Sequence, residues 1–144
     1  MLEKEKIMDL IEEIGFLTGS RRFGLSHSNS DFDFVILFKD FQKHMDRLRI
    51  PFCFCDPKKE KNIPQCIVTN NDYNKDKYFR SYNVSDKEYN YNIIMVWQES
   101  EFRIWKEVTN LIEKTPLYLI KEKKDRVLLF ETLKTILRNR QKKA

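Results

Sequence analysis

The sequence predicts an α/β fold of the α+β kind, in which a small mixed sheet is flanked by helices. Two patterns support this prediction. Apolar residues recur three and four positions apart, as on one face of a helix, in residues 2–14, 99–114 and about 118–140. Short apolar runs typical of buried strands occur in residues 15–18, 31–38 and 89–97. With 144 residues, 41% of them hydrophobic, the chain has the length of one domain, and we expect a single domain over residues 1–144.

The first half of the chain contains two predicted helices and two predicted strands. Residues 2–14 form an amphipathic helix that Gly15 is well placed to end. A short buried strand, 15–18, then runs directly into Gly19-Ser20, and a polar connection follows over 21–30. Residues 31–38 are apolar on both faces after Asp33, which predicts a central strand covered on both sides. A short helix over 40–49 is closed by Pro51.

The second half begins with a segment, 50–75, whose only readable element is a short strand near 66–69. Residues 78–82 and 89–97 predict a hairpin joined by a polar turn at 83–87, with the second strand inside the sheet. A helix over 99–114 has Ser100 as its candidate N-cap. The last predicted helix has a buried stripe made of Leu129, Phe130, Leu133, Ile136 and Leu137.

Charge and cysteine content restrict the class of protein. The net charge of +5 comes from residues 121–144, which hold nine basic and three acidic side chains. This basic C-terminal helix could contact nucleic acid or a host protein through Lys134, Arg138, Arg140, Lys142 and Lys143, although a solvated helix end is the commoner use of such a run. No apolar run is long enough to span a membrane and no signal peptide is readable, so we expect a cytoplasmic protein. Three cysteines, Cys53, Cys55 and Cys66, could form a zinc site with His44, but their spacing favours buried thiols.

The chemistry of the chain is concentrated in one stretch. Its three glycines, Gly15, Gly19 and Gly24, all lie there. A Gly19-Ser20 turn after a buried strand can offer backbone N–H groups and a hydroxyl to a phosphate, and Arg21 and Arg22 follow it directly. Asp31 and Asp33 are two apart on a strand and therefore share one face. Two carboxylates beside a phosphate-binding turn predict a triphosphate held through Mg²⁺.

This stretch resembles the nucleotidyltransferase superfamily related to DNA polymerase β. That superfamily carries Gly-Gly or Gly-Ser, then about nine to thirteen residues, then Asp-x-Asp/Glu flanked by apolar residues. Here ten residues separate Gly19-Ser20 from Asp31-Phe32-Asp33-Phe34. The string Gly-Ser-Arg-Arg-Phe-Gly, with Asn92-Ile93-Ile94 ahead of Phe102 and Trp105, also resembles short nucleotidyltransferase-like proteins encoded by bacteriophages.

The resemblance implies a nucleotidyltransferase-like fold and a set of roles. Gly19 and Ser20, with Arg21 or Arg22, would bind the phosphates of an NTP, and Asp31 and Asp33 would hold one or two Mg²⁺ ions. The activity implied is transfer of a nucleoside monophosphate to a hydroxyl on a protein, an RNA or a small molecule. The family's third catalytic carboxylate aligns with Asn92, an amide that cannot act as a base near neutral pH.

Two alternatives stay open. The chain could be a catalytically impaired relative that binds a nucleotide, a nucleic acid or a host protein as a regulator, including one carried by a phage. In the other, Asp31 is only the solvent-exposed end of a strand and Asp33 pairs with Arg21 or Arg22.

Overall fold

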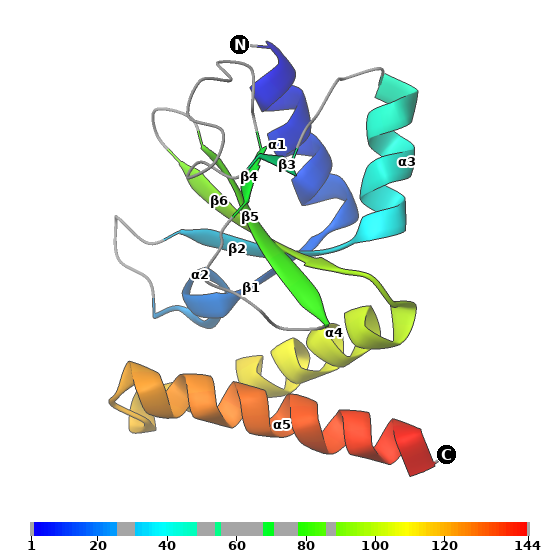
Figure 1. Ribbon diagram of the computed structural model, residues 1–144. Coiled ribbons are helices and arrows are strands. Elements are labelled where there is room, and N and C mark those ends of the chain that lie inside the picture. Colours follow the sequence, from blue (N-terminus) through cyan, green and yellow to red (C-terminus); the bar gives the residue numbers. More distant parts are fainter. Residues whose placement is uncertain are drawn as a thin grey trace.

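The computed structural model describes residues 2–25, 31–48, 54–55, 68–70, 78–85 and 89–143. The helices are α1 (Leu2–Ile14), α2 (Gly19–Phe23), α3 (Phe38–Leu48), α4 (Glu99–Glu113) and α5 (Lys123–Lys143), with a 3-10 turn, η1 (Leu117–Leu119), before α5. The strands are β1 (Phe16–Thr18), β2 (Phe32–Leu37), β3 (Phe54–Cys55), β4 (Val68–Asn70), β5 (Phe79–Ser85) and β6 (Asn90–Val96). The predicted α+β class is confirmed (Figure 1).

The strands form one mixed sheet in the order β1-β2-β6-β5-β4-β3. β2 runs parallel to β6 and antiparallel to β1, and β5 pairs antiparallel with β6 over seven residue pairs. β2 and β6 therefore lie inside the sheet, as their apolar sequences predicted.

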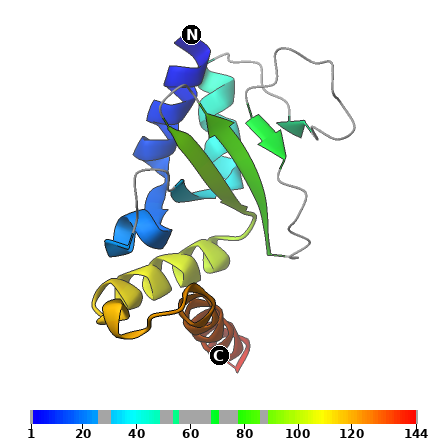
Figure 2. The same ribbon diagram turned by 90° about the vertical axis from the view of Figure 1, so that its left-hand side faces the viewer.

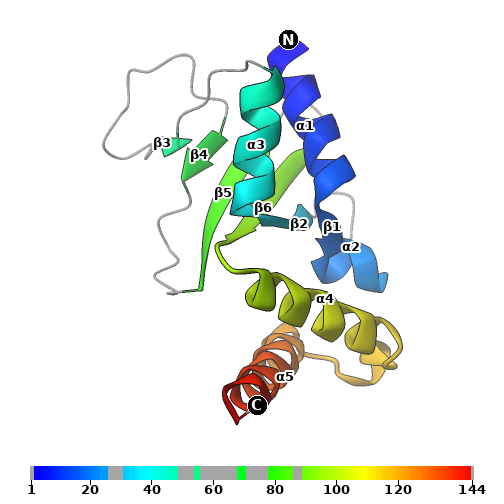
Figure 3. The same cartoon turned by 90° about the vertical axis from the view of Figure 1, so that its right-hand side faces the viewer.

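Helices cover both faces of the two central strands. Phe34 and Ile36 of β2 belong to the core cluster that α1 and α3 close, whereas Val35 and Leu37 pack with Trp105 of α4 and Phe130 of α5. Successive strand residues point to opposite faces, so an unbroken apolar run supplies both layers. Seen from opposite sides, Figures 2 and 3 show α1 and α3 together beside the sheet, with α4 and α5 at its other end.

Several local predictions need correction. Residues 19–23, expected to be a turn and connection, form α2. The predicted turn at 83–87 is wrong at its start, because β5 continues to Ser85 and pairs with β6 throughout. Gln98, not Ser100, is the N-cap of α4, and α5 begins at Lys123 rather than near 118, because η1 intervenes.

The remaining predictions differ in outcome. Leu129, Phe130, Leu133 and Leu137 pack onto the core as expected, but Ile136 is 42% exposed and does not belong to the buried stripe. Cys53 and Cys66 lie outside the described residues, so the structure does not test the zinc alternative. None of the described helices is both long enough and apolar enough to cross a bilayer.

Candidate functional site

The Gly19-Ser20 turn is the start of the short helix α2. Thr18, the last residue of β1, is extended at the N-cap position, and Gly19 has φ 72°, a left-handed conformation that favours glycine. The hydroxyls of Thr18 and Thr109 lie 2.9 Å apart in a buried hydrogen bond. This bond ties the strand that precedes the turn to α4.

Gly19 lies directly against Asp33 of β2. A Cβ atom at residue 19 would sit 2.3 Å from Asp33 Oδ2 and 3.1 Å from its Cγ. Any side chain at this position would therefore displace the carboxylate. The two halves of the sequence motif, ten residues apart, are in contact, and the missing Cβ is what permits it.

Asp33 is the centre of a row of polar residues across the sheet. Thr18 is its cross-strand partner on β1, Asn92 is its partner on β6, and Asn83 of β5 faces Asn92 in turn. Asn92 Nδ2 donates a hydrogen bond of 3.0 Å to Asp33 Oδ1. Asn92 Oδ1 is buried and has no hydrogen-bond partner within the described part of the chain. The structure thus brings Asn92 next to Asp33, where the alignment with the family's third carboxylate had placed it.

Burial raises the pKa of the Asp33 carboxyl above its ordinary value. The hydrogen bond from Asn92 lowers that pKa, the nearby Asp31 carboxylate raises it, and the ammonium of Lys123 lowers it. Removing the Asp33 charge from water is therefore only partly compensated by the protein. A cation bound at this carboxylate would supply the missing compensation.

Asp31 lies two residues before Asp33, at the entrance to β2, and is exposed. The described residues contain no group of three or more His, Cys, Asp or Glu side chains suited to a metal ion. Two carboxylates and the unpartnered Asn92 Oδ1 nevertheless offer the hard oxygen donors that Mg²⁺ takes, since this ion usually completes its shell with water and phosphate oxygens. These residues fit a divalent cation bound together with a phosphorylated ligand.

The two arginines of α2 contact other parts of the protein. The Arg22 guanidinium is 2.8 Å from Glu113 Oε2 on α4. Arg21 stacks on Phe32, with its Cζ 4.3 Å from the ring centroid. Their predicted role in nucleotide binding stays a prediction.

A cavity of about 390 Å³ lies beside the Gly19-Ser20 turn. Its polar lining comes from the turn, from β2 and from the first turns of α5, namely Thr18, Gly19, Ser20, Asp33, Lys123, Arg126 and Glu131. Its apolar lining is Phe23, Leu25, Ile94, Trp105, Ile112, Leu117, Val127 and Phe130. The volume falls in the range of about 300–1,000 Å³ that is typical of small-molecule sites.

Sequence reasoning missed Lys123 and Arg126 as site residues. They lie three positions apart on α5 and so share a side of the helix. Lys123 forms no ion pair among the described residues other than its longer-range attraction to Asp33. Arg126 Nη1 donates to the backbone carbonyls of Ile120 and Lys121, at 2.8 and 3.0 Å. Their spacing indicated that they share one side of a helix, but nothing in the sequence indicated which element that side would face.

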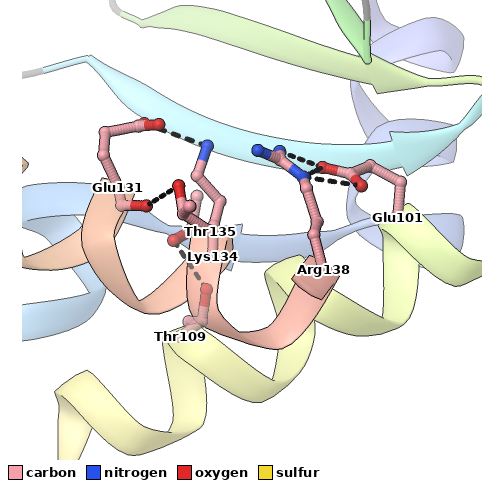
Figure 4. A network of polar contacts seen from close by, with 7 residues as sticks. Glu101, Thr109, Glu131, Lys134, Thr135 and Arg138 are labelled. Carbon is pink, nitrogen blue, oxygen red and sulfur yellow. Dashed lines mark hydrogen bonds and ion pairs between the residues drawn. The ribbon is translucent and has the colours of Figure 1, made fainter. Parts of the chain in front are cut away.

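Two cations of α5 are used inside the protein. Lys134 is fully buried, with its Nζ 3.6 Å from the Trp105 ring centroid and 2.9 Å from Glu131 Oε1. Arg138 pairs with the buried Glu101 of α4 (Figure 4). Assigning Lys134 and Arg138 to a basic binding surface is therefore wrong, because both hold α5 onto the core. Arg140 and Lys142 are exposed, and the side chain of Lys143 lies outside the described set.

Comparison with known proteins gives one match. Residues 9–129 match the family model described as nucleotidyltransferase domain. Neither a curated protein nor a solved structure matches the chain.

Proposed function

Because the chain belongs to the nucleotidyltransferase domain family, we propose that it transfers a nucleoside monophosphate from an NTP to a hydroxyl acceptor. The acceptor hydroxyl gives up its proton to water, a bond forms between its oxygen and the α-phosphorus, the bond from that phosphorus to the β-phosphate bridging oxygen breaks, and pyrophosphate leaves. Asp31 and Asp33 would hold Mg²⁺, which supplies charge stabilisation on the phosphates. Gly19 and Ser20 would bind the β- and γ-phosphates.

One observation carries this proposal: the Asp33 carboxylate is fixed between Gly19 and Asn92 beside a cavity of small-molecule size. Contact between the glycine turn and the metal-type carboxylate lets a single triphosphate meet both. Lys123, which lines the same cavity, adds positive charge to it.

Asn92 favours a second candidate function. An amide cannot take the proton of the attacking hydroxyl, and within the described residues no third His, Cys, Asp or Glu completes a metal-binding group with Asp31 and Asp33. A nucleotide-binding relative that turns over slowly or not at all, and acts as a regulator, uses the same pocket. The two functions differ only in whether transfer occurs.

The test is incubation with Mg²⁺, each labelled NTP and a cell lysate as the source of acceptors. We expect label transfer that disappears in Asp31→Ala and Asp33→Ala and persists in Asp46→Ala, an exposed aspartate on α3. If neither the wild type nor any variant transfers label, but the wild type binds NTP in a Mg²⁺-dependent way by calorimetry, the result supports the regulatory function. Loss of both transfer and binding in the wild type removes the nucleotide hypothesis.

A further inference from the structure

The Gly19-Ser20 turn receives little support from the two elements that flank it. β1 has only three residues and is an edge strand that pairs with β2 alone. α2 has five residues and buries none of them. Elements with few buried contacts open more readily than the rest of a domain. A turn that must keep Gly19 against Asp33 therefore needs to be held from outside β1 and α2.

The neighbouring helix α4 is firmly packed and contacts the chain on both sides of this turn. It has 15 residues, of which six are buried, and burial of one face is what stabilises most helices in proteins. Its residue Thr109 contacts the residue before the turn. Asn110 and Glu113, in the following turn of the helix, contact a residue after it.

The contact before the turn joins the hydroxyls of Thr18 and Thr109, which lie 2.9 Å apart. Both threonines are almost completely buried, with exposed fractions of 2% and 1%. Thr18 occupies the N-cap position of α2, where a threonine commonly bonds to its own helix, but here its side chain makes no cap bond. Because Thr18 directly precedes Gly19 and pairs across the sheet with Asp33, its bond to α4 holds the start of the turn beside the carboxylate.

The contact after the turn is made by Arg22. Its Nη2 donates to Glu113 Oε2 at 2.8 Å and to Asn110 Oδ1 at 3.5 Å. The side chains of Arg22 and Glu113 are 30% and 47% exposed, so solvent screens this pair, and it contributes less than a buried pair does. The Arg22 guanidinium is nevertheless directed toward α4, and α2 is held at the end opposite to Thr18.

We propose that Thr109 and Glu113 are positioning residues, which together hold the Gly19-Ser20 turn where it meets both Asp33 and the phosphates of a nucleotide. Neither residue lines the cavity, so each acts through its partner in the turn. The role in phosphate binding rests on the proposed function, whereas the support of the turn by α4 is a property of the free protein. Removing a side chain that orients a ligating group commonly lowers affinity by about ten- to a hundredfold.

The first test measures Mg·tripolyphosphate binding by calorimetry, because this ligand has no base or sugar and reports on the phosphate-binding turn. Thr109→Val keeps the shape of the side chain but removes the hydroxyl, and should weaken binding roughly tenfold. Thr109→Ser restores a hydroxyl and should bind as the wild type does. Affinity is measured well below the unfolding transition, so a moderate loss of stability does not by itself change it.

Glu113→Ala and Glu107→Ala form a matched pair for the contact after the turn. Both remove one negative charge from α4, but Glu107 is an exposed residue that does not contact Arg22. Glu113→Ala should weaken Mg·tripolyphosphate binding about threefold, since the pair with Arg22 is half exposed, and Glu107→Ala should leave it unchanged. Because the two contacts hold one turn, Thr109→Val and Glu113→Ala together should weaken binding by more than the roughly thirtyfold product of their separate effects.

The second test needs no ligand. Amide hydrogen exchange of residues 16–23 reports how often the turn opens, and exchange of β6 reports the stability of the domain. Relative to β6, Thr109→Val should speed exchange at the turn on the order of tenfold, whereas Thr109→Ser and Glu107→Ala should not. Equal acceleration of both segments would mean that Thr109 only stabilises the fold, and would overturn the inference.

The binding results separate the inference from the proposed function. Equal Mg·tripolyphosphate affinities in the wild type, Thr109→Val and Glu113→Ala would overturn the inference and leave the proposed function standing, as would a failure of Thr109→Ser to retain affinity. Tighter binding by Glu113→Ala would show that Arg22 is a phosphate ligand withheld by Glu113, and would overturn the positioning role of Glu113. If the wild type binds neither Mg·NTP nor Mg·tripolyphosphate, the proposed function fails, and hydrogen exchange alone decides whether α4 holds the turn.

Discussion

Gly19 and Gly24 allow a controlled test of how the glycine turn positions Asp33. The two residues bracket α2 and have nearly the same positive φ, 72° and 74°. They differ in surroundings, because a Cβ at Gly24 would meet no atom within 4 Å, whereas one at Gly19 would lie 2.3 Å from Asp33 Oδ2. Gly24→Ala therefore measures the backbone strain alone, and Gly19→Ala adds displacement of the carboxylate.

The expected magnitudes separate stability from function. The left-handed conformation makes alanine unfavourable by roughly 1–2 kcal/mol at either position. In a domain of this size, each kcal/mol lowers Tm by about 2–4 °C. The Asp33 carboxylate is the end of a side chain and can rotate, so the clash should add little further instability. It must however move by about 1 Å to reach ordinary contact, and a shift of that size in a reacting site lowers activity by on the order of a hundredfold.

Thermal unfolding and Mg·NTP calorimetry check both parts. We expect similar losses of Tm in the two variants, with weakened Mg·NTP binding in Gly19→Ala only. Equal Mg·NTP binding by Gly19→Ala and Gly24→Ala in the native background would refute the reasoning.

Three further predictions concern the carboxylates. Burial raises the Asp33 pKa, so the contribution of this group to stability is present at acidic pH and is lost as pH rises through the folded-state pKa. Asp33→Asn should therefore raise Tm at pH 7, and this gain in Tm should disappear near pH 3. A difference in Tm between the two proteins that does not change over this pH range would contradict the prediction. Asn92→Asp places a second carboxylate beside Asp33, so it should lower Tm without Mg²⁺, bind Mg²⁺ about tenfold more tightly by calorimetry, and increase any label transfer. Glu101→Ala breaks the buried pair with Arg138 and should destabilise by about 3–5 kcal/mol in urea unfolding. Glu99→Ala, which removes an exposed pair from the same helical turn, should leave the urea midpoint nearly unchanged.

The predictions are right for elements with a long apolar pattern, and they are wrong for short helices and for the exact ends of elements. The helix of residues 2–14 and the central strands could be predicted from apolar periodicity, because burial of one or both faces determines which positions must be apolar. α2 has only five residues, Gly19–Phe23, and buries none of them, so it leaves no apolar period to detect. β5 extends through Asn83 because pairing with β6 satisfies its backbone, which outweighs the preference of asparagine for turns.

The candidate site was also predicted only in part. Spacing on one strand placed Asp31 beside Asp33, and alignment with the family placed Asn92. The cavity lining from α5 could not be predicted, because it depends on how α5 is rotated against α4. Lys134 is the clearest case: a lysine reads as a surface residue, yet aromatic rings and Glu131 take the place of water around it.

The position of β2 between a neighbour in sequence and a distant one has a consequence for folding kinetics. β1 and β2 are close along the chain, so the contact of Gly19 with Asp33 has a small sequence separation. The contact of Asp33 with Asn92 spans 59 residues, and that of Thr18 with Thr109 spans 91. Contacts with such large sequence separation form late, since their loops must first be closed. We therefore expect a folding chain to assemble the glycine turn and the aspartates before it has a cavity, so that ligand affinity develops only in the last steps of folding.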